Sequence, residues 1–226
     1  MDIDLIKITV YLSLLVQVIT GIFDYYVIQL NIPSNLLILQ EVLIMELIVQ
    51  IVEGIFYIWL ALNISSVTNI TPHRYYDWYL TTPTMLISLC IYLVYLKNEE
   101  RNIETQDSFF KIIYDNLNVL ISILFLNFLM LTAGYLTEIK KVPQVLGVLL
   151  GFIPFFIFFY LIYHYFARFT LFGTEMFFYF LIVWSLYGVA ALMSYRLKNI
   201  MYNILDLFAK NFFGLYLGYV ILNSLN

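Results

Sequence analysis

The sequence has 226 residues, of which 63% are hydrophobic and only 12% charged, and its net charge is −4. A soluble domain carries about a quarter charged residues, so this composition favours a lipid bilayer as the surrounding solvent. The acidic balance gives no reason to expect a nucleic-acid partner. The single cysteine, Cys90, excludes an internal disulfide framework.

Long apolar runs alternate with short polar segments along the chain. Asp, Glu, Lys and Arg are absent from four long runs, namely 78–96, 116–137, 142–167 and 176–195. Each run is close to the ~20 residues that a helix needs to span the hydrocarbon. We expect seven membrane-spanning helices, near residues 4–31, 34–63, 74–97, 107–136, 143–166, 174–195 and 199–223. The predicted fold class is an all-α membrane protein, a seven-transmembrane-helix bundle in one domain, residues 1–226.

The segments between these helices are short and polar. The most charged of them, residues 97–107, and the basic segment 196–199 are both expected to be solvated loops.

Seven acidic residues fall within or at the ends of the expected helices, where ionisable groups are costly and usually functional. Three of them, Asp24, Asp115 and Glu175, are expected to lie near the membrane interfaces. The other four are Glu46, Glu53, Asp77 and Asp206.

Lys210 lies near the middle of the last expected helix, four residues after Asp206, so the two side chains share one helix face. A structural ion pair is one interpretation, although such pairs are uncommon in the middle of a membrane. The alternative is a lysine amine linked to a carbonyl cofactor as a Schiff base. If protonated, it needs carboxylate partners in a low dielectric. Asp206 and Asp77 would supply them, and Arg74 would balance the extra negative charge.

Three motifs resemble signatures of the microbial rhodopsins. RYYDWYLTTP, residues 74–83, resembles their helix C signature RYxDWxxTTP, and DLFAK, residues 206–210, resembles the Asp-x-x-x-Lys signature of helix G. Trp184 and Tyr187 in VWSLYG resemble the helix F pair that packs against retinal, although Gly188 replaces the usual Pro. The motifs occur in the family's order, and the resemblance covers nearly the whole chain.

This resemblance implies all-trans retinal bound to Lys210 as a protonated Schiff base, with Asp77 as the main counterion and Asp206 as the second. Thr81 would hydrogen-bond Asp77. The retinal pocket would be lined by Trp78, Thr82, Trp184 and Tyr187. The fifth expected helix lacks the Trp that the family often places against the retinal ring. Candidates to replace it are Phe152, Phe155 and Phe156.

Two features weigh against an outward proton pump. Ser88 occupies the position, eleven residues after Asp77, where pumps of this family carry a donor carboxylate, and no glutamate pair precedes the last helix. The second expected helix instead places Glu46, Gln50 and Glu53 at i, i+4 and i+7, on one stripe. Such residues can simply join neighbouring helices. Carboxylates along a hydrated path, however, favour cations and repel anions.

This stripe resembles the rhodopsins of large algal viruses, specifically the group with light-gated cation channel activity. There the path runs between helices A, B, C and G, with glutamates from helix B and an Asn after the retinal lysine. The expected path residues here are Ser13, Gln17, Glu46, Gln50, Glu53 and Asn211. Glu46 and Glu53 are expected to lie away from Lys210.

The resemblance therefore implies a retinal-binding photoreceptor that acts as a light-gated channel for monovalent cations or protons. A light-driven proton pump and a sensory rhodopsin are the alternatives. No enzymatic activity, catalytic residue or metal site is expected. The predicted location is a membrane, crossed several times, and a host-cell membrane if the chain is viral. The lipid bilayer is the expected partner, and homo-oligomer formation is left open.

Overall fold

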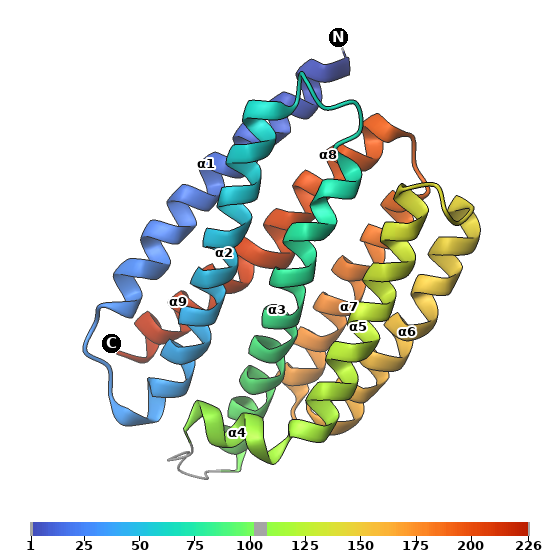
Figure 1. Cartoon of the computed structure of the whole chain (residues 1–226). Coiled ribbons are helices and arrows are strands. Elements are labelled where there is room, and N and C mark those ends of the chain that lie inside the picture. The colour runs from blue at the N-terminus through green and yellow to red at the C-terminus, as the bar shows by residue number, and fades with distance from the viewer. Residues whose placement is uncertain (1, 102–107, 226) are drawn as a thin grey trace.

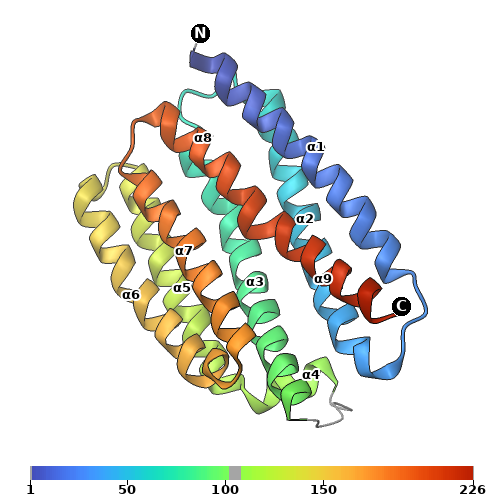
Figure 2. The same ribbon diagram turned by 180° about the vertical axis from the view of Figure 1, so that it is seen from behind.

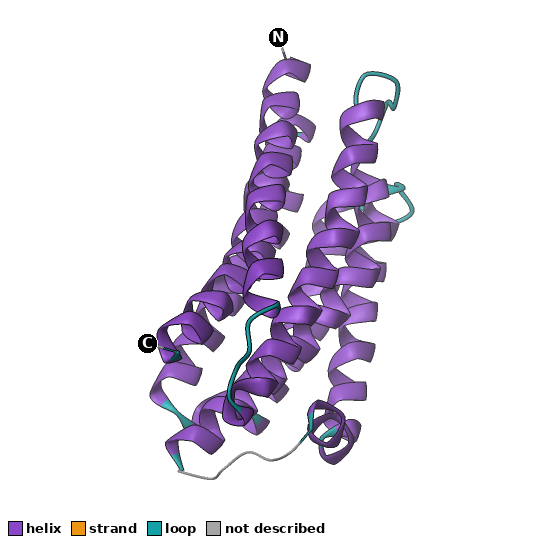
Figure 3. Cartoon of the chain, turned by 90° about the vertical axis from the view of Figure 1, so that its left-hand side faces the viewer, coloured by secondary structure: helices purple, strands orange, loops and turns teal. Residues whose placement is uncertain are grey.

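A computed structural model of the protein describes residues 2–101 and 108–225. Every regular element in these ranges is helical (Figure 3). Seven of the described helical segments are long and apolar enough to cross a membrane. The predicted all-α, seven-span architecture is thereby confirmed.

The first four spans are formed by α1 (Asp2–Ile28), η1 (Ser34–Leu36) with α2 (Leu37–Asn63), α3 (Thr71–Glu100) and α5 (Leu117–Glu138). The short α4 (Phe109–Asp115) precedes α5 and lies outside its span. The remaining three contain α6 (Gln144–Tyr165) with η2 (Ala167–Phe169), α7 (Leu171–Ala191), and the group α8 (Tyr195–Asp206), η3 (Leu207–Asn211) and α9 (Phe212–Ser224). The element η3 is a π-helical turn, so α8, η3 and α9 together form the seventh span.

The helices form one bundle, with α1 and α2 on one side, α3 in the middle and α5 to α7 on the other side (Figure 1). Seen from behind, α8 and α9 cross the bundle between α7 and α1 (Figure 2). α8 packs against α1 and α7, and α9 packs against α1 and α2. We call the end of the bundle that holds the N-terminus the N-terminal end, and the opposite end the C-terminal end.

Large apolar side chains cover much of the outer surface, and several charged side chains lie in the interior. Ile22, Leu62 and Leu80 are among many large apolar side chains that face outward. In a bilayer these side chains contact lipid. Polar groups are satisfied only inside the bundle, and charged side chains such as Arg74 and Lys210 are accordingly buried there.

The predicted fourth helix, 107–136, is divided into α4 and α5 at Asn116. The side-chain amide Nδ2 of Asn116 donates a hydrogen bond to the carbonyl oxygen of Ile112 at 2.9 Å. Such a side-chain bond competes with the backbone bonds that continue a helix. The expected start at residue 107 lies outside the described residues.

The last span starts earlier than the sequence predicted. Residues 196–199, expected to be a loop, belong to α8, which follows the extended residue Ser194. Lys198 is consequently buried, and its Nζ pairs with Oε1 of Glu138 at 2.7 Å. The loop prediction was wrong because the basic residues suggested a solvated segment, whereas a carboxylate on α5 balances the charge.

Candidate functional site

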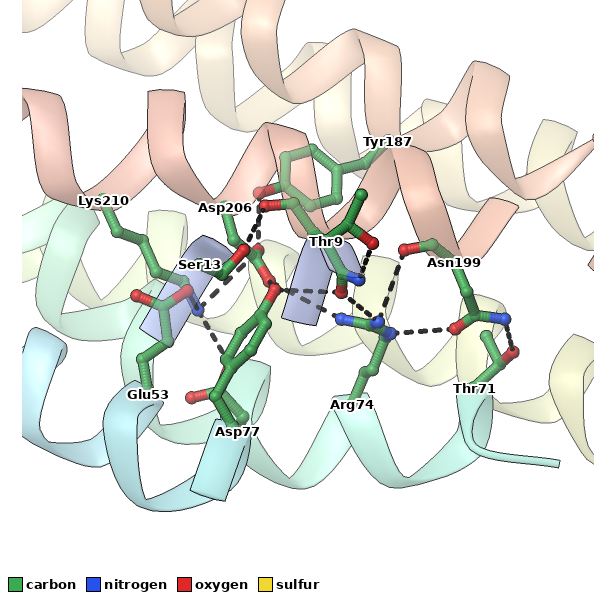
Figure 4. Close-up of polar contacts among 12 residues, drawn as sticks. Thr9, Ser13, Glu53, Thr71, Arg74, Asp77, Tyr187, Asn199, Asp206 and Lys210 are labelled. Carbon is green, nitrogen blue, oxygen red and sulfur yellow. Dashed lines mark hydrogen bonds and ion pairs between the residues drawn. The ribbon is translucent and has the colours of Figure 1, made fainter. Parts of the chain in front are cut away.

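Lys210 lies in the π-helical turn Leu207–Asn211, and 1% of its surface is exposed. Three carboxylates surround its ammonium nitrogen Nζ (Figure 4). Oδ2 of Asp77 lies at 2.7 Å, Oε1 of Glu53 at 3.5 Å and Oδ1 of Asp206 at 3.8 Å. They come from α3, α2 and α8, so two other spans converge on the span that holds the lysine. A buried ammonium requires such partners because an uncompensated buried charge is strongly destabilising.

Two of these carboxylates are the expected ones, and the third is a correction. Asp77 is hydrogen-bonded to Lys210 and Asp206 lies one helical turn from it. Glu53 was expected to lie away from Lys210, and this expectation was wrong. α2 packs directly against the turn that holds Lys210. The Glu53 position of the α2 stripe therefore reaches the lysine.

Asp206 is held by two tyrosines from different helices. The hydroxyl of Tyr57 on α2 donates to Oδ2 at 2.7 Å, and the hydroxyl of Tyr187 on α7 donates to Oδ1 at 2.7 Å. Nη1 of Arg74 lies 3.7 Å from Oδ2. Hydrogen bonds to an ionised group are stronger than neutral ones, so this arrangement fixes the orientation of the Asp206 carboxylate.

Arg74 occupies the interior between Asp206 and the N-terminal end of the bundle. Its Nε donates to Oδ1 of Asn199 at 3.1 Å, and its Nη2 donates to Oδ1 of Asn203. Asn199 in turn donates to the hydroxyl of Thr71 at 3.1 Å (Figure 4). These amides give the buried guanidinium polar partners besides Asp206, so it joins α3 to α8.

An apolar pocket adjoins Lys210 and encloses about 780 Å³ of space, part of it open to the surroundings. The four predicted pocket residues, Trp78, Thr82, Trp184 and Tyr187, all line it. Thr82 also accepts a hydrogen bond from the amide of Asn127 at 2.8 Å.

The other residues predicted to lie around the pocket are only partly where they were expected. Phe152 and Phe155 line its wall, whereas Phe156 faces outward with 56% of its surface exposed. Thr81 donates to the backbone carbonyl of Asp77 at 3.0 Å rather than to its carboxylate. The two side chains are on the same face of α3, but the nearest acceptor for this hydroxyl is the helix backbone one turn earlier.

Gly188 makes room for an aromatic ring at the pocket wall. A Cβ at Gly188 would lie 2.5 Å from Cζ of Phe152. The Phe152 ring thus occupies space that a larger residue at position 188 would fill. The pocket has an amine at one end and aromatic walls. These features fit a flat apolar molecule whose carbonyl reacts with Lys210, and retinal is such a molecule.

A second cluster of polar side chains lies between Lys210 and the C-terminal end of the bundle. Asp24, which was expected near the membrane interface, is fully buried there, and Nε2 of Gln50 donates to its Oδ2. An absent side chain at Gly214 leaves space for this pair between the helices. The other two residues given the same expectation, Asp115 and Glu175, are exposed.

All six predicted path residues are buried, although their polar contacts differ. Ser13 donates to the carbonyl oxygen of Asn203 at 3.1 Å. Asn211 donates to Thr20 at 3.0 Å. The side-chain amide of Gln17 and both carboxylate oxygens of Glu46 find no hydrogen-bond partner among the described residues.

Several members of this interior were not predicted from the sequence, although a spacing signal was present. Residues 46, 50, 53 and 57 on α2 have the same i, i+4, i+7, i+11 spacing as residues 199, 203, 206 and 210 on the seventh span. Both series are polar, and extending each one would have identified Tyr57, Asn199 and Asn203. Residues 13, 17, 20 and 24 on α1 have the same spacing, and this third series would have identified Thr20. Asn127 occurs singly among apolar neighbours, and only the packing of the helices reveals it.

The chain has the fold of several solved structures. The viral rhodopsin OLPVRII aligns with a TM-score of 0.82 and 26% identity, covering 98% of this chain and 99% of that one. The Exiguobacterium sibiricum rhodopsin aligns with a TM-score of 0.75 and 15% identity, over 98% and 97% of the two chains. Xanthorhodopsin, described as a light-driven ion pump with dual chromophore, aligns at 0.73 and 17% identity, over 97% and 93%.

No curated protein matches the chain in sequence. The family model described as bacteriorhodopsin-like protein matches residues 4–224, nearly the whole chain. The predicted resemblance to microbial rhodopsins, with a viral rhodopsin among the similar structures, is confirmed. The chain therefore belongs to the bacteriorhodopsin-like family, and this membership implies a retinal chromophore in a multi-pass membrane protein.

Proposed function

We propose that the protein is a light-gated cation channel with all-trans retinal attached to Lys210. The observation that carries this proposal is the line of buried polar side chains that passes Lys210 between α1, α2 and the seventh span. It includes Glu46, whose two carboxylate oxygens have no hydrogen-bond partner in the described part of the chain. Buried polar groups are normally paired. An unpaired carboxylate in the membrane interior therefore supports a path that admits water or cations.

Retinal, when bound, supplies visible absorption and a change of shape on illumination. Lys210 would hold it through the side-chain nitrogen, while Trp78, Trp184 and Tyr187 would confine it between α3 and α7. Asp77 is the nearest carboxylate to that nitrogen and would serve as the main counterion.

Charge in the centre of the bundle favours cations. Lys210 and Arg74 contribute two positive charges, and Glu53, Asp77 and Asp206 can contribute three negative ones. A proton on one carboxylate, or a cation beside them, would balance the difference. Groups of this sign attract cations and exclude anions from a narrow path. Monovalent cations or protons are therefore the proposed substrates.

A light-driven proton pump is the second candidate, and one observation favours it. Glu46 is a buried carboxylate on the C-terminal side of Lys210, seven residues before Glu53 on α2. Glu46 could return a proton to the Lys210 nitrogen, in place of the donor carboxylate that is replaced by Ser88 in this sequence. If the chain is viral, either activity would operate in a host-cell membrane, and assembly into homo-oligomers is compatible with both.

The two candidates differ in the voltage dependence of the photocurrent. We expect the light-induced current of the full chain, expressed with all-trans retinal, to reverse sign with voltage. We also expect the reversal potential to follow the cation gradient, because flow through a channel is passive. A current of one sign across the physiological voltage range would instead establish the pump.

A further inference from the structure

We propose that Asp24 and Gln50 form the closing contact of the ion path on its C-terminal side. We further propose that a hydrogen-bond chain through Thr20 and Asn211 couples this contact to the turn that holds Lys210. The proposal rests on the channel function, because a closing contact has a role only where ions flow passively.

Four side chains link the Lys210 turn to Asp24 without interruption. Nδ2 of Asn211 donates to Oγ1 of Thr20 at 3.0 Å, and Oγ1 of Thr20 donates to Oε1 of Gln50 at 2.9 Å. Nε2 of Gln50 completes the chain by donating to Oδ2 of Asp24. None of the four is more than 4% exposed. The Thr20 hydroxyl orients the Gln50 amide so that its NH₂ group faces the carboxylate.

Asn211 directly follows Lys210 within the π-helical turn. Single π-turns interrupt the regular α-helical bonding and often occur at functional sites. Because the two residues share one short backbone segment, a displacement of Lys210 also displaces the Asn211 amide. The first bond of the chain, from Asn211 to Thr20, is then the first to lengthen.

Helix α9 also packs directly against the Asp24–Gln50 pair. A Cβ at Gly214 would lie 2.7 Å from Nε2 of Gln50 and closer still to Oδ2 of Asp24, so any larger residue there requires the pair to shift. One turn later, a Cβ at Gly218 would lie 2.6 Å from the Phe23 ring. α1 and α9 therefore approach closely at Asp24 and at the neighbouring Phe23. A shift of α9 would change the space available to the Asp24–Gln50 pair.

Polar atoms without hydrogen-bond partners lie along the hydrogen-bond chain from Asn211 to Asp24. Oδ1 of Asp24, the Gln17 amide and Oδ1 of Asn211 are buried and have no hydrogen-bond partner within residues 2–101 and 108–225. Their oxygens can bind water or a cation once the pair separates. The closing contact thus lies beside ligands for the permeating ion rather than in an apolar plug.

The first test compares Thr20→Val with Thr20→Ser in the full chain under voltage clamp. Valine cannot bond to Gln50, so the closed state loses a buried hydrogen bond. Since such a loss shifts an equilibrium by about tenfold, we expect the dark current and the closing time after illumination to rise by roughly that factor. Serine keeps the hydroxyl and should leave both quantities near the parent values.

The second test uses two glycines beside the same amide. Gly214→Ala should force the Asp24–Gln50 pair apart and slow closing, in the same direction as Thr20→Val. Gly21→Ala is the matched control, because its Cβ would meet Oε1 of Gln50 at 3.6 Å, an ordinary contact. The visible absorption band of each variant shows whether it has folded and bound the chromophore.

The outcomes separate the closing contact from the channel function. If the parent current reverses with voltage but Thr20→Val and Gly214→Ala both close at the parent rate, the closing contact is overturned and the channel remains. If the parent current never reverses, the channel function fails and the closing contact fails with it.

Discussion

Oε1 of Glu53 lies 3.5 Å from Nζ of Lys210, which brings the second span into the charge centre of the bundle. Glu53 is fully buried, and its carboxylate oxygens accept no hydrogen bond within the described residues. Its main interaction is therefore the attraction to the lysine. One carboxylate thus belongs both to the lysine site and to the polar stripe along α2.

Glu53→Gln should move the visible absorption band to longer wavelength. A nearby negative charge stabilises the positive charge on the Lys210 nitrogen in the ground state more than in the excited state. Removing this negative charge narrows the energy gap between the ground and excited states. The shift should be smaller than for Asp77→Asn, since Asp77 is nearer, at 2.7 Å. Absorption spectra of the two purified variants at neutral pH provide the comparison, and an unchanged Glu53→Gln band would contradict the role given to the 3.5 Å contact.

Asp77→Asn should produce a marked red shift or release the proton from the lysine–retinal linkage. Acidification of the parent should reproduce the red shift, because protonation of Asp77 also removes its negative charge. A pH titration of the visible band checks both effects. Unchanged colour together with an unchanged acid titration would exclude Asp77 as the main counterion.

Lys210→Ala should abolish the visible band after incubation with all-trans retinal. The variant loses the amine, and no covalent adduct can form at position 210. It also removes the positive charge beside three carboxylates, so Lys210→Met, which better preserves side-chain volume, is a useful second variant. Mass spectrometry of the parent should locate the adduct at Lys210, and a parent-like band in both variants would refute the assignment.

Glu46→Gln should change conductance or cation selectivity while leaving the visible band nearly unchanged. Glu46 lies two helical turns from Glu53 along α2, on the C-terminal side of Lys210. Its charge therefore acts on the path more than on the chromophore. Photocurrents recorded in two cation gradients measure the effect. Parent-like reversal potentials and amplitudes would remove Glu46 from the path.

Gly188→Ala should destabilise the protein or reshape the pocket. The new Cβ would overlap the Phe152 ring, and overpacking of this kind costs roughly 1–3 kcal/mol. The double variant Gly188→Ala with Phe152→Leu should recover part of the loss, because the smaller side chain can move aside. Thermal loss of the visible band gives the readout. Equal stability of Gly188→Ala and the parent would contradict the prediction, because it would show that the Phe152 ring can move aside without cost.

The sequence determined the class of fold and the centre of the site. Runs of about twenty apolar residues have one stable solution in a bilayer, since only internal hydrogen bonding satisfies the backbone there. The motif around Asp77 and the spacing of Asp206 from Lys210 likewise placed the main charges, because spacing along a helix fixes which side chains share a face.

Only the tertiary structure decided which spans meet at each charge. The sequence gives the stripe on α2, but not the closeness of α2 to the π-helical turn, so it could not show that Glu53 reaches Lys210. The same holds for Asp24, whose burial depends on Gly214 far along the chain. A side chain's position on its own helix follows from local periodicity. Its partner follows from how closely two helices approach, and that distance is set by the packing of side chains remote in sequence.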